Sequence, residues 1–322
     1  MNRVRQSTFA TAGFERHQKI TKRAAFLAEM DQLVPWQRLC TIVEKHYPRG
    51  EGGRPTIGLE RMLRMYFLQL WFNLSDPAVE EALYDIGSMR VFVGVDLGRE
   101  RVPDETTVCK FRHLLEKHRL GERIFKAINA HLAGLGMKIG TGTIVDATII
   151  HAPSSTKNAA KERDPEMHST KKGNQWYFGM KLHIGVDSKQ TLVHSVAGTA
   201  ANVHDSQKLS ELLHGRETRV WGDSAYRGQR EVIRKRAPRA QDFTNERAHR
   251  HHQLTDKQRQ TNRTKSRVRA VVEHPFGVVK RLWGFTKVRY RGVAKNLHRA
   301  QVMFGLSNLY LSRNKLLRLR QA

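Results

Sequence analysis

Residues 143–150 read Thr143-Ile144-Val145-Asp146-Ala147-Thr148-Ile149-Ile150, and this short stretch decides the fold. Its β-branched residues are typical of a strand, and it begins just after Gly140, where helical periodicity stops. One acid, Asp146, stands inside the run. Because an unpaired buried acid is costly, two readings are open. Either the strand lies at a sheet edge and Asp146 faces solvent, or Asp146 is held inside for chemistry.

The chain downstream supplies partners for this strand. Residues 153–175 are polar and predict a mobile basic loop. Strands are expected at 176–186 and 191–197, joined by a turn at 187–190, and again at 219–223. Helices are expected from His204 through Leu213 and from about Thr264 to Arg281, the latter disturbed at Pro275. The order strand, hairpin, helix, strand and later helix favours an α/β fold with a ribonuclease-H-like core.

The chain upstream is predicted to be an all-α domain. A helical pattern at 24–47 is interrupted by Pro35, and 50–55 reads as a loop. Apolar residues from Leu59 to Leu70 recur at three- and four-residue steps, which predicts one buried helix face. Ser75-Asp76-Pro77 and Asp104 predict two further helix starts. Such helices form either a helix-turn-helix or a plain bundle, and the sequence leaves both open.

Positive charge dominates the composition. Lysine and arginine number 57 against 30 aspartates and glutamates, which gives a formal net charge of +27. Residues 201–322 alone hold 28 basic and 9 acidic side chains, and no acid follows Glu273. A surplus of this size favours a polyanionic partner, above all nucleic acid, over an ordinary basic surface.

The cysteine content and the hydropathy of the chain indicate the cellular compartment of the protein. Cys40 and Cys109 are the only cysteines, and they lack the spacing of a zinc site. Free thiols indicate a reducing compartment. No run of about 20 apolar residues predicts a membrane span, and the basic N-terminus lacks the apolar segment of a signal peptide. We therefore expect a cytoplasmic, nucleoid-associated protein without membrane contact.

Three acids are candidates for phosphodiester chemistry, which calls for a few carboxylates in a basic surround to hold divalent cations. Asp146 lies in the strand described above. Asp223 ends the strand at 219–223, where an ordinary turn or N-cap role is the alternative. Glu273 shares one helix face with Arg269 and Lys280 at 3.6 residues per turn. For this face the alternative is a surface ion-pair network.

The contexts of these acids resemble the insertion-sequence-five family of bacterial transposases, which carry an Asp-Asp-Glu catalytic domain. The likeness covers roughly residues 20–311. Residues 59–64, 71–76 and 80–85 resemble the N-terminal segment of the family, and residues 172–187 resemble the hairpin that follows the first Asp. Residues 145–150, 223–228 and 272–281 resemble the first-Asp, second-Asp and Glu motifs, in that order.

The resemblance implies roles for individual residues. Asp146, Asp223 and Glu273 would be catalytic and would hold two Mg²⁺ or Mn²⁺ ions. Arg269 and Lys280 fit the Arg-x3-Glu-x6-Lys pattern and would contact DNA phosphates. Related elements often carry Tyr three residues before that Arg, where this chain has Ser266. Further DNA contacts are expected along the basic stretch from Lys280 to Arg299, at Arg281, Lys287, Arg289 and Arg291.

The expected function is that of an insertion-sequence transposase. Residues 1–137 would form a helical domain for DNA binding and dimerisation, and residues 138–322 the catalytic domain with a basic helical tail. A homodimer or larger assembly would bind double-stranded element ends and target DNA. The alternatives are a nuclease of the same fold, which cuts without joining, and a catalytically silent DNA-binding regulator.

Two smaller expectations concern aromatic and histidine side chains. Trp283 and Tyr290 are candidates for stacking on a distorted base, with burial in the core as the alternative. His249, His251 and His252 invite a metal interpretation. Because cysteines and regular ligand spacing are missing there, we expect a solvated basic loop instead.

Overall fold

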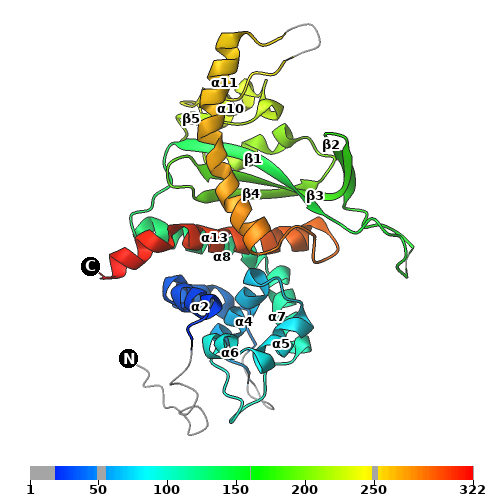
Figure 1. Ribbon diagram of the computed structural model, residues 1–322, viewed down its shortest axis with the longest axis vertical. Coiled ribbons are helices and arrows are strands. Elements are labelled where there is room, and N and C mark those ends of the chain that lie inside the picture. The colour runs from blue at the N-terminus through cyan, green and yellow to red at the C-terminus, as the bar shows by residue number, and fades with distance from the viewer. Residues whose placement is uncertain (1–18, 49–55, 160, 249–252, 322) are drawn as a thin grey trace.

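A layer of N-terminal helices occupies one end of the molecule, and a sheet flanked by helices occupies the other (Figure 1). The computed structural model describes residues 19–48, 56–159, 161–248 and 253–321. The helices of the N-terminal layer are α2 (Lys22–Leu33), α3 (Trp36–Glu44), α4 (Leu59–Trp71), α5 (Asp76–Asp85), α6 (Gly87–Val93), α7 (Glu105–Lys117) and α8 (Leu120–Gly134). The loop predicted at 50–55 lies outside the described residues.

The helix starts follow the predicted capping residues. The Ser75 hydroxyl accepts the Ala78 N–H at 3.2 Å, and the Asp104 carboxylate accepts the Thr107 N–H at 2.7 Å. Each cap satisfies a backbone N–H that the first helical turn leaves without a partner. Pro35 separates α2 from α3, and the apolar face of α4 is buried. The helical prediction for this part of the chain is confirmed.

The sheet is built around β1. Its strands are β1 (Gly142–His151), β2 (His168–Lys172), β3 (Gln175–Asp187), β4 (Val193–Ala200), β5 (Arg219–Trp221) and β6 (Gln241–Asp242). β1, β3 and β4 pair antiparallel in the spatial order β4-β3-β1, and β5 and β6 continue the sheet parallel to β1. This is the ribonuclease-H-like arrangement that we predicted. Because β1 has neighbours on both sides, the edge-strand reading of Asp146 is wrong.

The segment predicted as a polar loop, 153–175, is a loop only in part. Its last residues form β2, which pairs with β3 from His168 opposite Gly179 to Lys172 opposite Gln175. Gly173, with φ of 62°, makes the two-residue turn with Asn174. The polar composition misled the prediction, because a hairpin strand needs cross-strand partners rather than a buried face.

A composite helix crosses the sheet. It begins at α11 (Asp256–Arg269), continues through a 3-10 turn (Ala270–Val272) and α12 (Glu273–Phe276), and ends in a π-helical turn (Gly277–Leu282). The start predicted near Thr264 is wrong, because Thr255 and Gln258 form a capping box that begins the helix at Asp256. The predicted disturbance near Pro275 is confirmed.

Short helices cover one face of the sheet. A 3-10 turn (Asp205–Lys208) leads into α9 (Leu209–Leu212), a second 3-10 turn (Ser224–Tyr226) follows β5, and α10 (Arg230–Arg236) precedes β6. Val145 faces a small core that includes Leu209 of α9 and Ile233 of α10. Ile144 and Ile150 face the main core.

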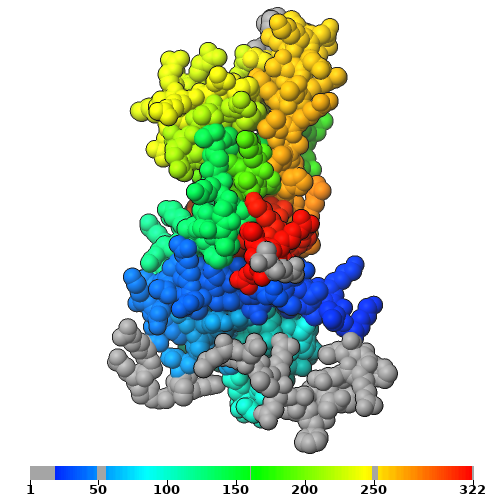
Figure 2. All heavy atoms as spheres, turned by 90° about the vertical axis from the view of Figure 1, so that its left-hand side faces the viewer, coloured from blue at the N-terminus to red at the C-terminus, as the bar shows by residue number. Residues whose placement is uncertain are grey.

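The C-terminal helix α13 (Val293–Gln321) joins the helical layer to the sheet. It packs on α8, α2 and α4 and also on β4 and β3. Figure 2 shows the red end of this helix between the blue helical layer and the green and yellow sheet region. One apolar core therefore runs through both parts, with Ile128 of α8, Phe304 of α13 and Ile184 of β3 among its fully buried members.

Two sequence-based expectations concern the compartment. Cys40 and Cys109 are both free thiols, as expected. In the described part of the chain, the helices are too short or too polar to span a membrane.

Candidate active site

Asp146 lies in the middle of β1, inside the sheet. Its side chain keeps 14% of its surface exposed. One carboxylate oxygen accepts the Ala147 N–H at 2.8 Å, and the other accepts a hydrogen bond from Arg269 Nη1 at 3.0 Å. A carboxylate in an interior strand is thus held by one arginine and one backbone amide.

Asp223 follows β5, the parallel neighbour of β1. The pairing sets Ile144 opposite Trp221, so the same register continued by two residues places Asp146 beside Asp223. Asp223 also accepts the Ala225 N–H at 2.9 Å and caps the following 3-10 turn. The turn role considered from the sequence is therefore real, and it fixes the carboxylate at the end of the strand.

Glu273 is the first residue of α12. The 3-10 turn Ala270–Val272 precedes it, and Pro275 follows at the third position of this short helix, where it is buried. The side chain of Glu273 is exposed, whereas its neighbour Val272 belongs to the main core. The break in the helix thus sets an exposed acid above a buried anchor, as Pro275 led us to expect.

The pKa of Asp146 reflects its burial and the charges around it. The net pKa of Asp146 is raised to about 6: burial raises it most, Arg269 and the Ala147 amide lower it, and the charges of Asp223 and Glu273 raise it by smaller amounts. Asp223 and Glu273 are therefore both close enough to Asp146 for their charges to act on it. Within the described residues, however, no three acidic, histidine or cysteine side chains gather closely enough to ligate a single ion.

Arg269 and Lys280 both reach β1 from the composite helix. Arg269 holds Asp146, and Lys280 Nζ donates to the Thr148 hydroxyl at 2.8 Å and to the Ile149 carbonyl at 3.1 Å. Burial lowers the pKa of Lys280, Lys172 and Arg281 lower it further, and Glu273 opposes them. These contacts join two separate elements, so they differ from the surface network considered as an alternative for this face.

The other predicted DNA contacts fall into two groups. Arg281 and Lys287 are exposed and make no ion pair within the described part of the chain. Arg289 instead donates to the Asn73 backbone carbonyl and, at 2.9 Å, to its side-chain oxygen, and Arg291 donates to the Arg163 carbonyl at 3.4 Å. All four remain predictions as DNA contacts, but the last two already bind protein groups.

The far end of the predicted basic stretch is not available to DNA. Arg299 is 1% exposed, and it contacts the Gln69 carbonyl and the Asn73 side chain. Trp283 is 2% exposed and belongs to the main core, so its burial alternative holds. Tyr290 is partly buried beneath the Arg112 guanidinium, which lies 4.2 Å from its ring centre. His249, His251 and His252 lie outside the described residues.

Sequence reasoning missed Tyr226. It is fully buried three residues after Asp223, and its hydroxyl has no hydrogen-bond partner among the residues that the structure describes. Burial raises its pKa well above the usual value, and Asp205, Asp146 and Asp223 reinforce the effect. A methyl group on Gly222 would meet the Tyr226 ring at 3.1 Å. The spacing Gly222, Asp223, Tyr226 was visible, but only the fold shows that the tyrosine lies beneath the acids.

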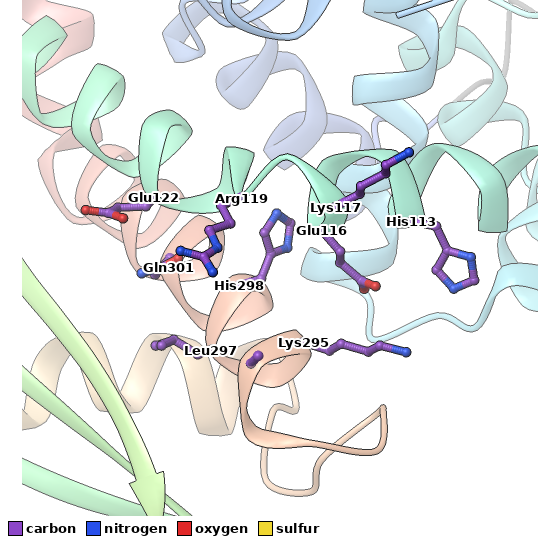
Figure 3. A pocket seen from close by; sticks show the side chains of 10 residues that line it. His113, Glu116, Lys117, Arg119, Glu122, Lys295, Leu297, His298 and Gln301 are labelled. Atoms are coloured by element: carbon purple, nitrogen blue, oxygen red, sulfur yellow. The ribbon is translucent and has the colours of Figure 1, made fainter. Parts of the chain in front are cut away.

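A cavity of about 670 Å³ lies away from these acids, between the α7–α8 junction and the start of α13. Figure 3 shows Lys117, Arg119 and Lys295 around it, and the His298 side chain extends from α13 toward α7 and α8. None of Asp146, Asp223 and Glu273 lines it. The cavity belongs to the junction between the helical layer and α13, not to the candidate active site.

Comparisons with known proteins bear on both parts of the chain. Residues 138–309, more than half of the chain, match the family model of the transposase DDE domain. Residues 14–114 match a second family model, described as Transposase domain (DUF772). Among solved structures, a cryo-EM structure of a piggyBac transposase synaptic complex with hairpin DNA is similar at 9% identity and a TM-score of 0.47. That similarity covers 91% of this chain and 74% of the other.

Proposed function

Since the chain belongs to the family of DDE transposases of the insertion-sequence-five or insertion-sequence-four kind, we propose that it acts on an insertion sequence. It binds the terminal inverted repeats, cleaves the DNA there and transfers the freed strand to a target. Asp146, Asp223 and Glu273 are the catalytic residues. The enzyme class comes with the family, whereas the substrate ends and the residue roles are our proposal.

The pKa of Asp146 carries the residue assignment. Burial and two further carboxylates raise it to about 6 although Arg269 lies 3.0 Å away. A buried carboxylate whose desolvation is not fully offset by its arginine is suited to a divalent cation. The three acids come from β1, the end of β5 and the start of α12, and the charges of Asp223 and Glu273 both contribute to the raised pKa of Asp146.

Members of this family generally use divalent metal ions, and the donors present fit Mg²⁺ or Mn²⁺. All are carboxylate oxygens, the ligands that these hard cations prefer. We propose two ions, because phosphoryl transfer is commonly catalysed by a pair of cations that stabilise both the attacking and the leaving oxygen. When bound, the ions would lower the pKa of the attacking water and stabilise negative charge on the phosphate oxygens.

The basic residues of the site position the acids and the DNA. Arg269 fixes Asp146, and its remaining guanidinium N–H groups are suited to a phosphate. Lys280 is fixed by Thr148 and by the Ile149 carbonyl, so its ammonium stands at a set position over β1. Arg281 and Lys287, both exposed, extend this surface for phosphates.

Two phosphoryl transfers make up the proposed reaction. Water attacks the phosphorus at the 3′ end of the element, the bond to the flanking nucleotide breaks, and a free 3′ hydroxyl remains. That hydroxyl then attacks a phosphodiester of the target, so that one P–O bond replaces another. Asp146, Asp223 and Glu273 would hold the metal ions, and no covalent bond to the protein forms.

We assign recognition of the element ends and dimerisation to the helical region, residues 1–137, and the chemistry to residues 138–322. The match of residues 14–114 to a separate transposase domain supports this division. The partner is double-stranded DNA, both element ends and target, bound by a homodimer or a larger assembly. Location at the nucleoid in the cytoplasm follows from this partner.

A cleavage assay tests the proposal. The protein is incubated with Mg²⁺ and a duplex that carries the flanked element end, beside Glu273→Ala and a control, Glu231→Ala. Glu231 is exposed on α10 and makes no ion pair in the described structure. We expect end-specific nicking by the wild type and the control, loss of nicking in Glu273→Ala, and DNA binding by all three in a gel shift.

Other outcomes would change the proposal. Retained nicking in Glu273→Ala would remove that residue from the site. Nicking without joining of pre-cut ends to target DNA, in a strand-transfer assay, would favour a nuclease of the same fold. Binding by the wild type without any nicking would favour the DNA-binding regulator.

A further inference from the structure

The β2–β3 hairpin carries an exposed tryptophan. β1 stops covering β3 at the pair His151–Gly179, and the hairpin continues beyond it to the turn at Gly173. Trp176, in this free part, keeps 67% of its surface exposed. Tryptophan is seldom left so open, because its ring gains more from burial than most side chains do.

The base of this hairpin is anchored. The Ala152 N–H donates to the Phe178 carbonyl at 2.8 Å, and the rings of His151 and Tyr177 lie 5.1 Å apart. A two-stranded ribbon on its own is marginally stable in water, so these contacts hold its root. Trp176 is therefore presented at a defined position rather than on a free loop.

The surroundings of Trp176 are basic. Lys171 stands directly opposite it in the hairpin register, and Lys172 follows. Neither lysine makes an ion pair within the described part of the chain. Arg163 lies over the Phe178 ring, 5.4 Å from its centre, and Phe178 is the next residue inward on the same face of β3. Cations around an exposed ring suit a polyanion that also presents flat faces to stack on.

The hairpin lies on the side of the acids. Alternate residues of β3 from Trp176 to Ile184 share one face, and Ile184 is paired with Asp146. The eight residue steps from Trp176 to Ile184 span roughly 26 Å at about 3.3 Å each. Lys172 is also close enough to Lys280 to lower its pKa. Trp176 thus stands within about one turn of duplex DNA from the proposed site of cleavage.

We propose that Trp176 stacks on an unpaired or unstacked DNA base within one helical turn of the cleaved phosphate, while Lys171 and Lys172 hold the adjoining phosphates. Aromatic stacking combined with basic side chains is how proteins bind exposed bases. We therefore assign to Trp176 the base-stacking role that was considered above for Trp283, which is buried. The inference rests on the proposed function, because it takes DNA as the partner.

The test uses the full-length protein in EDTA, so that it does not depend on cleavage. Duplexes of the element end carry 2-aminopurine at successive positions on both sides of the cleavage point. We expect wild-type binding to raise the fluorescence at one or two positions. Trp176→Ala should lose that signal and bind about tenfold more weakly, and Trp176→Phe should keep most of both.

Two controls separate stacking from a folding defect. Leu319→Ala removes another exposed apolar side chain, 51% exposed near the end of α13, and should change nothing. Melting temperatures of all variants should match the wild type.

Defined results would overturn the inference. One is an unchanged 2-aminopurine signal in Trp176→Ala, and another is the absence of any responsive position in the wild type. A third is a change in oligomeric state with base unstacking intact, which would make Trp176 a contact between copies of the chain. Because cleavage in Mg²⁺ is measured separately, a protein that unstacks a base but does not cut would contradict the proposed function and leave this inference standing.

Discussion

The helical layer and the sheet each bury an aspartate against an arginine, yet the two aspartates differ in pKa. In the helical layer, Asp76 accepts Arg112 Nη2 at 2.9 Å and Gln69 Nε2 at 2.8 Å. Burial raises its pKa, but these hydrogen bonds outweigh burial and the net pKa is lowered. In the sheet, Asp146 has a comparable bond to Arg269, and its pKa rises to about 6.

The difference lies in the neighbours. Arg112 serves Asp76 and Glu116 together, and the amide of Gln69 helps to satisfy Asp76. Asp146 is more deeply buried, has one arginine and one backbone amide, and faces two more carboxylates. The first pair is locally satisfied and stabilises the fold. In the second set, burial and two nearby carboxylates outweigh Arg269 and the amide, so the charged form of Asp146 is not fully stabilised by the protein itself, as expected of a cation site.

The largest contrast should appear in catalysis. Asp146→Asn keeps the shape of the side chain but removes the charge, so we expect cleavage of the element end to fall by about 10³-fold or more. Asp76→Asn should cut at close to the wild-type rate at a temperature where it is folded. The measurement is the initial nicking rate in Mg²⁺. Equal losses in both variants would contradict the distinction between the two regions.

In stability, the helical layer should be affected more than the sheet. Arg112→Met leaves two buried carboxylates without their cation, and we expect unfolding in urea to become easier by about 3–5 kcal/mol. Arg269→Met should cost no more than about 1.4 kcal/mol at pH 7, because Asp146, with a pKa near 6, can take up a proton instead. A larger loss for Arg269→Met than for Arg112→Met would mean that the catalytic pair is the structural one.

The smallest effect should be in the pH dependence of stability. The lowered pKa of Asp76 means that its contribution is fully present above the usual value of 3.8 and is lost as the pH falls below it. The destabilisation caused by Asp76→Asn should therefore be complete at pH 6 and shrink toward pH 3. Urea unfolding of both proteins across this range measures it. A destabilisation that grows toward acid would show that the pKa of Asp76 is raised.

Local sequence signals were enough for most elements. The strand at Asp146, the turn at Asp187 and the helix starts at Asp76 and Glu105 are set by side chains within a few residues of one another. The predictions that failed concern elements whose local signal was absent or was not weighed. β2 was missed because its partner strand, not its own composition, makes it a strand, and the start of α11 was missed because polar capping residues were not weighed.

The same distinction between local sequence signals and long-range contacts applies to the candidate site. The sequence by itself singled out Asp146, Asp223, Glu273, Arg269 and Lys280, because their motifs are local, and it determined that the partner should be a polyanion, because charge is additive along a chain. Only the tertiary structure decided that Arg269 binds Asp146 across 123 positions, that Trp283 is buried and Trp176 exposed, and that Tyr226 lies beneath the acids. Burial and the sum of nearby charges depend on which distant segments meet, and no local pattern encodes that.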